Sequence, residues 1–217
     1  MLIIYTFHEI FNNFVTSAKK PKAALNVGHL NLLIQEDLFM NEYLKITTVQ
    51  QLVEELDDIE DHEKYGNIAK RIDIEQADFA LFESWKADTY SRNCIRRTVD
   101  YELLLLCWEA GQETPIHCHN EQECWVYVVE GELVEQRFDH ELKKIDVTGI
   151  ESTSLIQKEK SYMNDYLGYH SLANNSNQRA ISLHLYAKPI ERCRVYDKEE
   201  KCFNWVELEY HTSHMVH

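Results

Sequence analysis

Glycine and proline are scarce in this sequence, and long apolar segments are absent from it. The 217 residues include 6 Gly and 3 Pro, which excludes collagen-like and low-complexity chains. The longest apolar stretches are short, such as Leu103–Trp108, whereas a helix that crosses a membrane needs about 20 such residues. The first residues lack a basic leader and a sustained apolar segment. We therefore expect no membrane segment and no signal peptide.

Basic residues are outnumbered. There are 22 Lys and Arg against 37 Asp and Glu, so the formal net charge is −15. Proteins that bind the phosphates of nucleic acids gather Lys and Arg on one surface. The basic residues here are scattered along the chain, so the sequence predicts no nucleic-acid partner and no membrane partner. We interpret the acidity as an aid to solubility.

The cysteines include no Cys-x-x-Cys pair, so no cysteine-based zinc site is predicted. Hydrophobic residues make up 44% of the chain, which is enough for a core of its own. A secreted scaffold held by disulfides is therefore not predicted either. We expect free thiols in a cytoplasmic protein, with one exception at Cys124 that is described below. The six cysteines are Cys94, Cys107, Cys118, Cys124, Cys193 and Cys202.

The pattern of apolar residues changes near Ser91, from helical spacing to strands. We expect a helical N-terminal part at 46–90 and a β-barrel at 91–210. Residues 1–45 have a mixed apolar period and are interpreted as an N-terminal extension of uncertain role. Met40 precedes the first organised pattern, so we hypothesise that translation begins there. A protein starting at Met40 that proved insoluble or inactive would contradict this hypothesis.

Three helical segments are predicted in the N-terminal part. Thr48–Gln51 has the form of a capping box, with a hydroxyl residue followed by Gln three positions later, and apolar residues follow at helical spacing. A second helix is expected within Glu60–Arg71. A third is expected to start at Asp73, with three apolar residues on one face: Ala77, Leu81 and Trp85.

Beyond Ser91 the sequence predicts strands joined by short turns. Cys94–Thr98 and Tyr101–Trp108 are expected to form a hairpin. Trp125–Val129 and Leu133–Phe138 flank Glu130–Glu132, which is interpreted as another tight turn. Many short strands with frequent turns are typical of a β-barrel or a sandwich.

The segment Ala180–Tyr186 alternates apolar and polar residues, which predicts a half-buried strand. Its polar residues Ser182, His184 and Tyr186 would then share one face. Inward-facing polar residues need partners, so this row is a candidate for a functional role. The alternative is a set of partly buried aromatic and polar side chains with no such role.

His117-Cys118-His119 is the sharpest local motif. On a strand, residues two apart point to the same face, so both imidazoles could bind one metal ion, with Cys118 on the opposite face. By itself the motif is weak, and two incidental polar histidines are the alternative interpretation. We interpret Trp108, Trp125, Cys107 and Cys193 as core residues, and His140, His211, His214 and His217 as surface residues.

The surroundings of this motif resemble the cupin superfamily. Gly111 precedes His117 by six residues, and Gly168-Tyr-His170 leads to Asn174 in a spacing close to that of the second cupin motif. Cupins usually have a Glu ligand after the first two histidines. Here the matching position is Cys124.

That substitution makes the sequence look like the cysteine dioxygenases of type I, within the cupins. The similarity spans roughly residues 47–200. It includes Tyr90-Ser-Arg92-Asn93, Leu106-Cys-Trp108, Tyr162-Met-Asn-Asp165, and Ser182–Tyr186 followed by Pro189 and Cys193. The resemblance implies a mainly β fold, a jelly-roll-like cupin β-barrel with N-terminal packing helices.

The resemblance assigns His117, His119 and His170 to Fe(II), with no carboxylate ligand. Neutral imidazoles suit a first-row metal and leave positions open for reactants. The resemblance also assigns Arg92 to the substrate carboxylate, whose two oxygens match the planar guanidinium, and Tyr90 would assist it. A surface arginine is the alternative. The related mercaptopropionate-type enzymes usually lack Arg at this position, so Arg92 favours cysteine.

Two further roles follow from the resemblance. The hydroxyl of Tyr186 would hydrogen-bond the substrate or bound oxygen, and His184 would orient Tyr186. Cys124 would form a thioether with Tyr186, as animal-type members of the family do.

We therefore expect an enzyme that adds both atoms of O2 to the sulfur of L-cysteine and gives cysteine sulfinate. Its partners would be L-cysteine and O2, and we expect a monomer. The alternatives are a dioxygenase for another small thiol such as 3-mercaptopropionate, or a cupin that binds metal without catalysis. A metal-dependent isomerase would more naturally keep the missing Glu ligand.

Overall fold

The computed structural model describes residues 45–59, 64–142 and 152–213, which belong to one compact unit, Leu44–His217. The expected extension at 1–45 lies outside the described residues except for Lys45, and so does the hypothetical start at Met40. Among the described residues, no helix is long and apolar enough to cross a membrane.

Two of the three predicted helices are present. Helix α3 spans Val49–Asp57, and the Thr48 hydroxyl caps it by accepting a hydrogen bond from the Gln51 N–H at 3.1 Å. The Gln51 side chain returns to the N–H of Thr47 at 3.1 Å, one residue earlier than a standard capping box requires. Helix α4 spans Tyr65–Arg71.

The prediction of a third long helix is wrong. The structure has a short 3-10 helix, η3, at Gln76–Phe79, and Leu81 is 85% exposed. The buried residues of this segment are instead Ile72, Ile74, Phe79 and Phe82. The Asp78 carboxylate accepts a hydrogen bond from the Val49 N–H, so this segment turns back to cap α3 and does not continue as a helix of its own.

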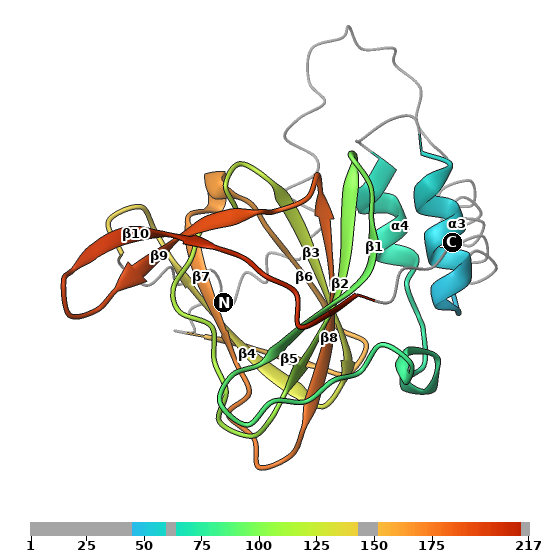
Figure 1. The fold of residues 1–217 in the computed structure, drawn as a ribbon, viewed down its shortest axis with the longest axis horizontal. Coiled ribbons are helices and arrows are strands. Elements are labelled where there is room, and N and C mark those ends of the chain that lie inside the picture. Colours follow the sequence, from blue (N-terminus) through green and yellow to red (C-terminus); the bar gives the residue numbers. More distant parts are fainter. Residues whose placement is uncertain (1–44, 60–63, 143–151, 214–217) are drawn as a thin grey trace, which may run out of the picture. The chain divides into compact units, whose positions relative to one another are not determined.

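The first sheet contains six strands in the order β11-β1-β2-β8-β3-β6 (Figure 1). The predicted hairpin is confirmed, because β1 pairs with β2 in antiparallel orientation. The strand β11 runs parallel to β1 at the edge of the sheet. The strands are β1 Ser91–Arg97, β2 Tyr101–Trp108, β3 Glu123–Glu130, β6 Lys160–Met163, β8 Ala180–Ala187 and β11 Thr212–Ser213.

The second layer combines a three-stranded sheet, β5-β4-β7, with the hairpin of β9 and β10. Residues 113–118 join the two, because His117 forms bridges to both His170 of β7 and Val195 of β9. The motif His117-Cys118-His119 thus starts in a strand-like segment, as predicted. The strands are β4 Glu132–Phe138, β5 Thr153–Ile156, β7 Tyr169–Ala173, β9 Arg192–Asp197 and β10 Cys202–Glu207.

The turn at Gly131 connects the two layers. Strands β3 and β4 are both present as predicted, but they belong to different sheets and do not pair with each other. Gly131 has a φ of +77°, and a Cβ there would lie 2.7 Å from the Arg179 carbonyl oxygen. Only glycine meets both requirements without strain.

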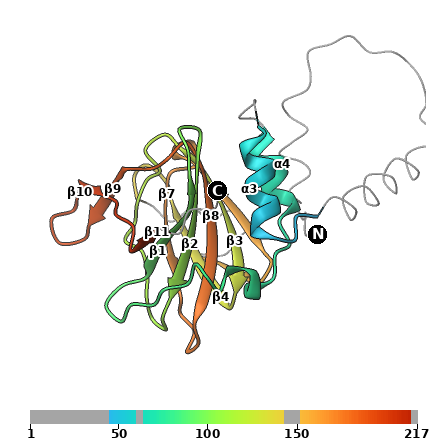
Figure 2. The same ribbon diagram turned by 45° about the vertical axis from the view of Figure 1, so that its right-hand side comes forward.

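Two apolar clusters separate the layers. One packs α3 and α4 against the outer face of the first sheet, as Figure 2 shows, and the other fills the space between the two sheets. Strand β8 is therefore buried on both faces, so the expectation of a half-buried strand is wrong. The fold is mainly β and jelly-roll-like with N-terminal packing helices, as predicted, although the described strands do not close into a barrel.

Candidate metal centre

The structure brings His117, His119 and His170 together between the two sheets. One ring nitrogen from each lies within 4.8 Å of the others, and the ring centroids are 4.6–5.3 Å apart. His119 and His170 are each 1% exposed. Backbone pairing fixes the approach of His170, because the His117 N–H donates to the His170 carbonyl oxygen at 3.0 Å and the His170 N–H donates to the His117 carbonyl oxygen at 3.2 Å.

Glu135 orients His170. Its Oε1 lies 2.8 Å from His170 Nδ1, which leaves His170 Nε2 facing His117 Nε2 at 3.2 Å. Burial favours a neutral Glu135, but His170, Arg137 and Ser161 outweigh this effect and lower its pKa to about 2. An ionised carboxylate behind a histidine fixes the ring and increases its strength as a metal ligand.

His119 has two buried ring nitrogens, and neither has a hydrogen-bond partner among the described residues. Its backbone N–H donates to Asp165 Oδ1 at 2.6 Å, which fixes its position. Burial, followed by the neighbouring histidines, lowers the pKa of His119 well below its usual value. A buried imidazole that is neutral and unpaired is suited to bind a metal ion.

His117 completes the set. Its Nδ1 lies 3.0 Å from the Pro115 carbonyl oxygen, so Nδ1 carries the proton and Nε2 is free to face the cluster. Burial, followed by His170, lowers the pKa of His117 to about 3. Among the described residues, the cluster contains no carboxylate that could serve as a fourth ligand. Three imidazole nitrogens of this kind fit a first-row transition metal.

Arg92 is buried in the interior, at 7% exposure, so its interpretation as a surface arginine is excluded. Its Nε and Nη2 have no hydrogen-bond partner in the described part of the chain. A buried cationic group without a partner is costly, so these two N–H groups are available for an anionic ligand. Tyr90 lies nearby, and its ring stacks on Trp108 with centroids 4.7 Å apart.

Tyr186 and Cys124 are directly opposite each other on β8 and β3, and both are buried. Burial raises the pKa of Cys124 to about 12. Burial, followed by Cys124, raises the pKa of Tyr186 well above its usual value. The geometry therefore places a neutral phenol beside a neutral thiol. On its other side, Tyr186 is opposite Glu102 of β2.

His184 contacts both Ser182 and Tyr186. Its Nε2 lies 2.8 Å from Ser182 Oγ, which accepts a hydrogen bond from Trp108 Nε1 at 3.0 Å. The rings of His184 and Tyr186 stack with centroids 6.3 Å apart. The polar row of β8 is thus connected to Trp108, and His184 approaches Tyr186 through its ring face.

The remaining expectations concern cysteines and core residues. The six cysteines form no disulfide in the structure. Cys118 Sγ accepts a hydrogen bond from the Arg194 N–H of β9 at 3.3 Å. Trp108, Cys107 and Cys193 are buried as predicted, while Trp125 is only partly buried against the helices.

Sequence reasoning missed Glu135 and the part played by Asp165. A signal for Glu135 was present, because it lies two residues after the apolar Leu133, so both point inward from β4. A carboxylate at an inward position of a strand needs a partner. Asp165 holds the N–H groups of both His119 and Glu121, and no sequence pattern predicts which backbone groups it contacts.

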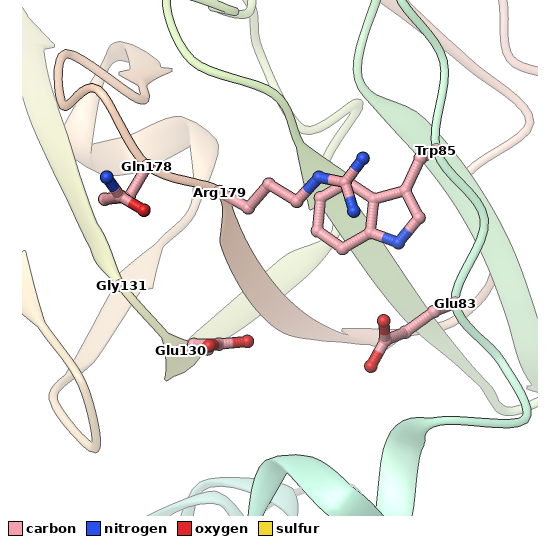
Figure 3. A pocket seen from close by; sticks show the side chains of 6 residues that line it. All are labelled: Glu83, Trp85, Glu130, Gly131, Gln178 and Arg179. Carbon is pink, nitrogen blue, oxygen red and sulfur yellow. The ribbon is translucent and has the colours of Figure 1, made fainter.

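A surface cavity of about 460 Å³ lies apart from the three histidines, none of which lines it. In Figure 3 the Arg179 guanidinium lies over the ring of Trp85, and the distance to the ring centroid is 4.2 Å. Arg179 also pairs with Glu109 at 2.8 Å. Its charge is already compensated, so this cavity contributes nothing to the metal centre.

Comparisons with known proteins agree with this geometry. The family model described as cysteine dioxygenase type I matches residues 37–199. Cysteine dioxygenase type 1 of Danio rerio is 28% identical over 179 residues, which cover 78% of this chain and 89% of the relative. The Rattus norvegicus protein of that name is 30% identical over 139 residues, which cover 63% and 70%.

Solved structures give a more distant likeness. A Klebsiella pneumoniae protein with a double-stranded beta-helix domain aligns with a TM-score of 0.42 at 17% identity, over 59% of this chain and 93% of that one.

Proposed function

The chain belongs to the cysteine dioxygenase type I family, and we propose that it oxidises L-cysteine with O2 to cysteine sulfinate. Arg92 carries the proposal. Its two N–H groups have no partner among the described residues, and its charge adds to the burial that lowers the pKa of His117, so a carboxylate-bearing thiol beside the histidines would satisfy them. Two N–H groups of one planar guanidinium bind a carboxylate with two hydrogen bonds, which is stronger and more specific than one.

The metal in this proposal is Fe(II), held by His117, His119 and His170. When bound, Fe(II) would supply a site that brings the substrate thiolate and O2 together. Glu135 keeps His170 directed at the metal, and the Asp165 carboxylate fixes the backbone of His119. Arg92 orients the substrate through its carboxylate, with Tyr90 beside it.

Tyr186 and Cys124 complete the proposed machinery. The Tyr186 phenol would donate a hydrogen bond to the substrate or to bound oxygen, and His184 would support its ring from the stacked face. We also propose a thioether between Cys124 Sγ and the Tyr186 ring, formed with loss of two hydrogens while O2 is reduced. A tryptic digest after turnover should contain the linked peptides, and only unmodified Cys124 peptide would contradict the proposal.

Oxygen uptake tests the activity directly. Iron-loaded protein should consume O2 with L-cysteine and release cysteine sulfinate, identified by mass spectrometry. Arg92→Gln should lose most of the L-cysteine turnover, because the carboxylate loses its two-bond partner. Higher turnover of 3-mercaptopropionate than of L-cysteine would favour the other-thiol alternative. Freshly purified protein without iron and without O2 uptake would indicate a non-catalytic cupin.

The proposal extends to the state of the protein in the cell. We propose a cytoplasmic monomer, since the cysteines form no disulfide and the site is assembled within one chain. Analytical ultracentrifugation of the full chain tests the monomer.

A further inference from the structure

The C-terminal segment, residues 208–213, lies against the strand that carries Arg92. Its last part forms β11, which runs parallel to β1 with Asn93 opposite Thr212. Its apolar residues Leu208 and Tyr210 pack against the cluster between the sheets. The segment thus covers the edge of the first sheet beside the proposed carboxylate site.

His211 of this segment binds the Arg92 backbone on both sides. The Arg92 N–H donates to His211 Nδ1 at 2.9 Å, and the His211 N–H donates to the Arg92 carbonyl oxygen at 2.8 Å. The first of these bonds is unusual, because an imidazole nitrogen here takes the place of the carbonyl oxygen that a neighbouring strand would supply. On this edge of β1, His211 thus bonds both backbone groups of Arg92, while β2 pairs with the other edge and has Leu106 opposite Arg92.

Other contacts fix the segment around His211. The Tyr210 hydroxyl donates to the buried carboxylate of Glu102 and accepts from Arg97 Nη1, the latter at 2.6 Å. The Thr212 hydroxyl donates to Asn93 Oδ1 at 2.8 Å. His211 therefore lies between two anchored neighbours, and its ring has a defined position relative to β1.

The bond also defines the protonation of His211. A backbone N–H can only donate, so Nδ1 must be unprotonated and the ring proton resides on Nε2. His211 is an exposed residue, but its partial burial lowers its pKa, and the positive charges of Lys86 and Arg92 lower it further, against Asp88 and Glu209. These effects favour the neutral ring that can accept the bond.

We infer that His211 is a positioning residue for substrate binding: its Nδ1 fixes the Arg92 backbone from which the guanidinium reaches the substrate carboxylate. This inference rests on the proposed function, since it assigns the carboxylate to Arg92. Arg92 has no hydrogen-bond partner for Nε or Nη2 in the described residues. The backbone of Arg92 therefore sets the direction of the guanidinium, and His211 holds that backbone on the edge that β2 does not cover.

Side chains that mimic one imidazole nitrogen at a time provide the test. Asn at position 211 places its Oδ1 near the position of Nδ1, so His211→Asn keeps an acceptor for the Arg92 N–H. Gln reaches only as far as Nε2, and Ala has no acceptor. Binding is measured by calorimetry on iron-loaded protein without oxygen, with L-cysteine and with cysteamine, which has the same thiol and amine but no carboxylate.

We expect His211→Ala and His211→Gln to weaken L-cysteine binding about two- to tenfold, the usual effect of one hydrogen bond. His211→Asn should bind L-cysteine like the wild type, and all three variants should bind cysteamine like the wild type. In parallel, amide hydrogen exchange at Arg92 should accelerate in the Ala and Gln variants and stay slow in the Asn variant.

Arg92→Gln separates this inference from the proposed function. If it leaves L-cysteine binding unchanged, the carboxylate site itself is wrong, and the role of His211 is wrong with it. If Arg92→Gln weakens binding but His211→Ala does not, only the inference about His211 is overturned. Equal losses for L-cysteine and cysteamine, or no rescue by Asn, would indicate general damage and would also overturn it.

Discussion

The two faces of strand β8 carry different kinds of residue, and they differ in role: one packs in the apolar core and the other faces the candidate metal centre. Ile181, Leu183 and Leu185 point toward α3 and α4 and belong to the apolar cluster beneath the helices. Ser182 and His184 alternate with them and point into the space between the sheets, where every polar group has to find a partner. Burial is nearly complete on both faces. Burial alone therefore does not distinguish the roles of the two faces. The chemistry of the side chains decides which face stabilises the fold and which face contributes to the binding site.

Among the variants that test this comparison, we expect the largest effect from the loss of a metal ligand. His119→Ala should lower the affinity for iron at least about a thousandfold, since each ligand of such a site contributes several kcal/mol. Unfolding of the metal-free protein should change far less. Iron content by mass spectrometry measures the first effect, and the exposed His140→Ala is the matched control. Unchanged iron binding by His119→Ala would contradict the assignment of the metal centre to the interior face.

The reverse result is expected on the helix-covered face. Leu183→Ala should lower the free energy of unfolding by about 3 kcal/mol, because it removes a fully buried side chain and leaves a cavity. Iron affinity and the activity per folded molecule should be retained. Urea unfolding monitored by circular dichroism measures the change. A loss of iron affinity as large as that of His119→Ala would mean that the two faces are not separable.

A weaker effect on the metal centre is expected from the residue behind His170. Glu135→Gln should reduce iron affinity about 10- to 100-fold, the usual result of losing a carboxylate that orients a ligand. The amide can still accept from His170 Nδ1, so the fold should be preserved. Competition with a metal chelator measures the affinity, and the outward-facing Glu132→Gln on the same strand is the control. Equal affinities of the two variants would contradict the role of Glu135.

The smallest effect concerns pH. His184 has a pKa well below its usual value, because of burial and then the charge of Arg92. The unfolded chain binds a proton near pH 6.5 and the folded protein does not, so stability is lost as the pH falls below 6.5. Between pH 7 and pH 5 the loss due to His184 is roughly 2 kcal/mol.

Metal-free His184→Gln should therefore lose roughly 2 kcal/mol less than the wild type over the same interval. Urea titrations at pH 7 and pH 5 give the difference. Parallel pH dependences would show that His184 accepts its proton in the folded protein, and that the interior face is more open to water than the helix-covered one.

The sequence predicted which residues form strands better than it predicted which strands pair with each other. The residues of β3 and β4 were identified correctly because β-branched and aromatic residues flank a glycine turn, but they enter different sheets. The helix expected from Asp73 failed for a related reason. Ala77, Leu81 and Trp85 are spaced as in a helix, but a helix would not bury Ile72, Ile74 and Phe79 as the observed fold does. Tertiary packing overrode the local preference for a helix.

The sequence alone determined that His117 and His119 could share a metal, since two residues apart on a strand-like segment face the same way. It also determined, through Cys124 in place of a carboxylate, which family the chain resembles. His170 was assigned only by the family resemblance. The tertiary structure shows how it joins the other two, through its backbone pairing with His117, and that Glu135 lies behind it. Contacts between residues far apart in the chain depend on how the sheets stack, and no local pattern encodes that arrangement. The contact of His211 with Arg92, which lies 119 positions earlier in the sequence, is of the same kind.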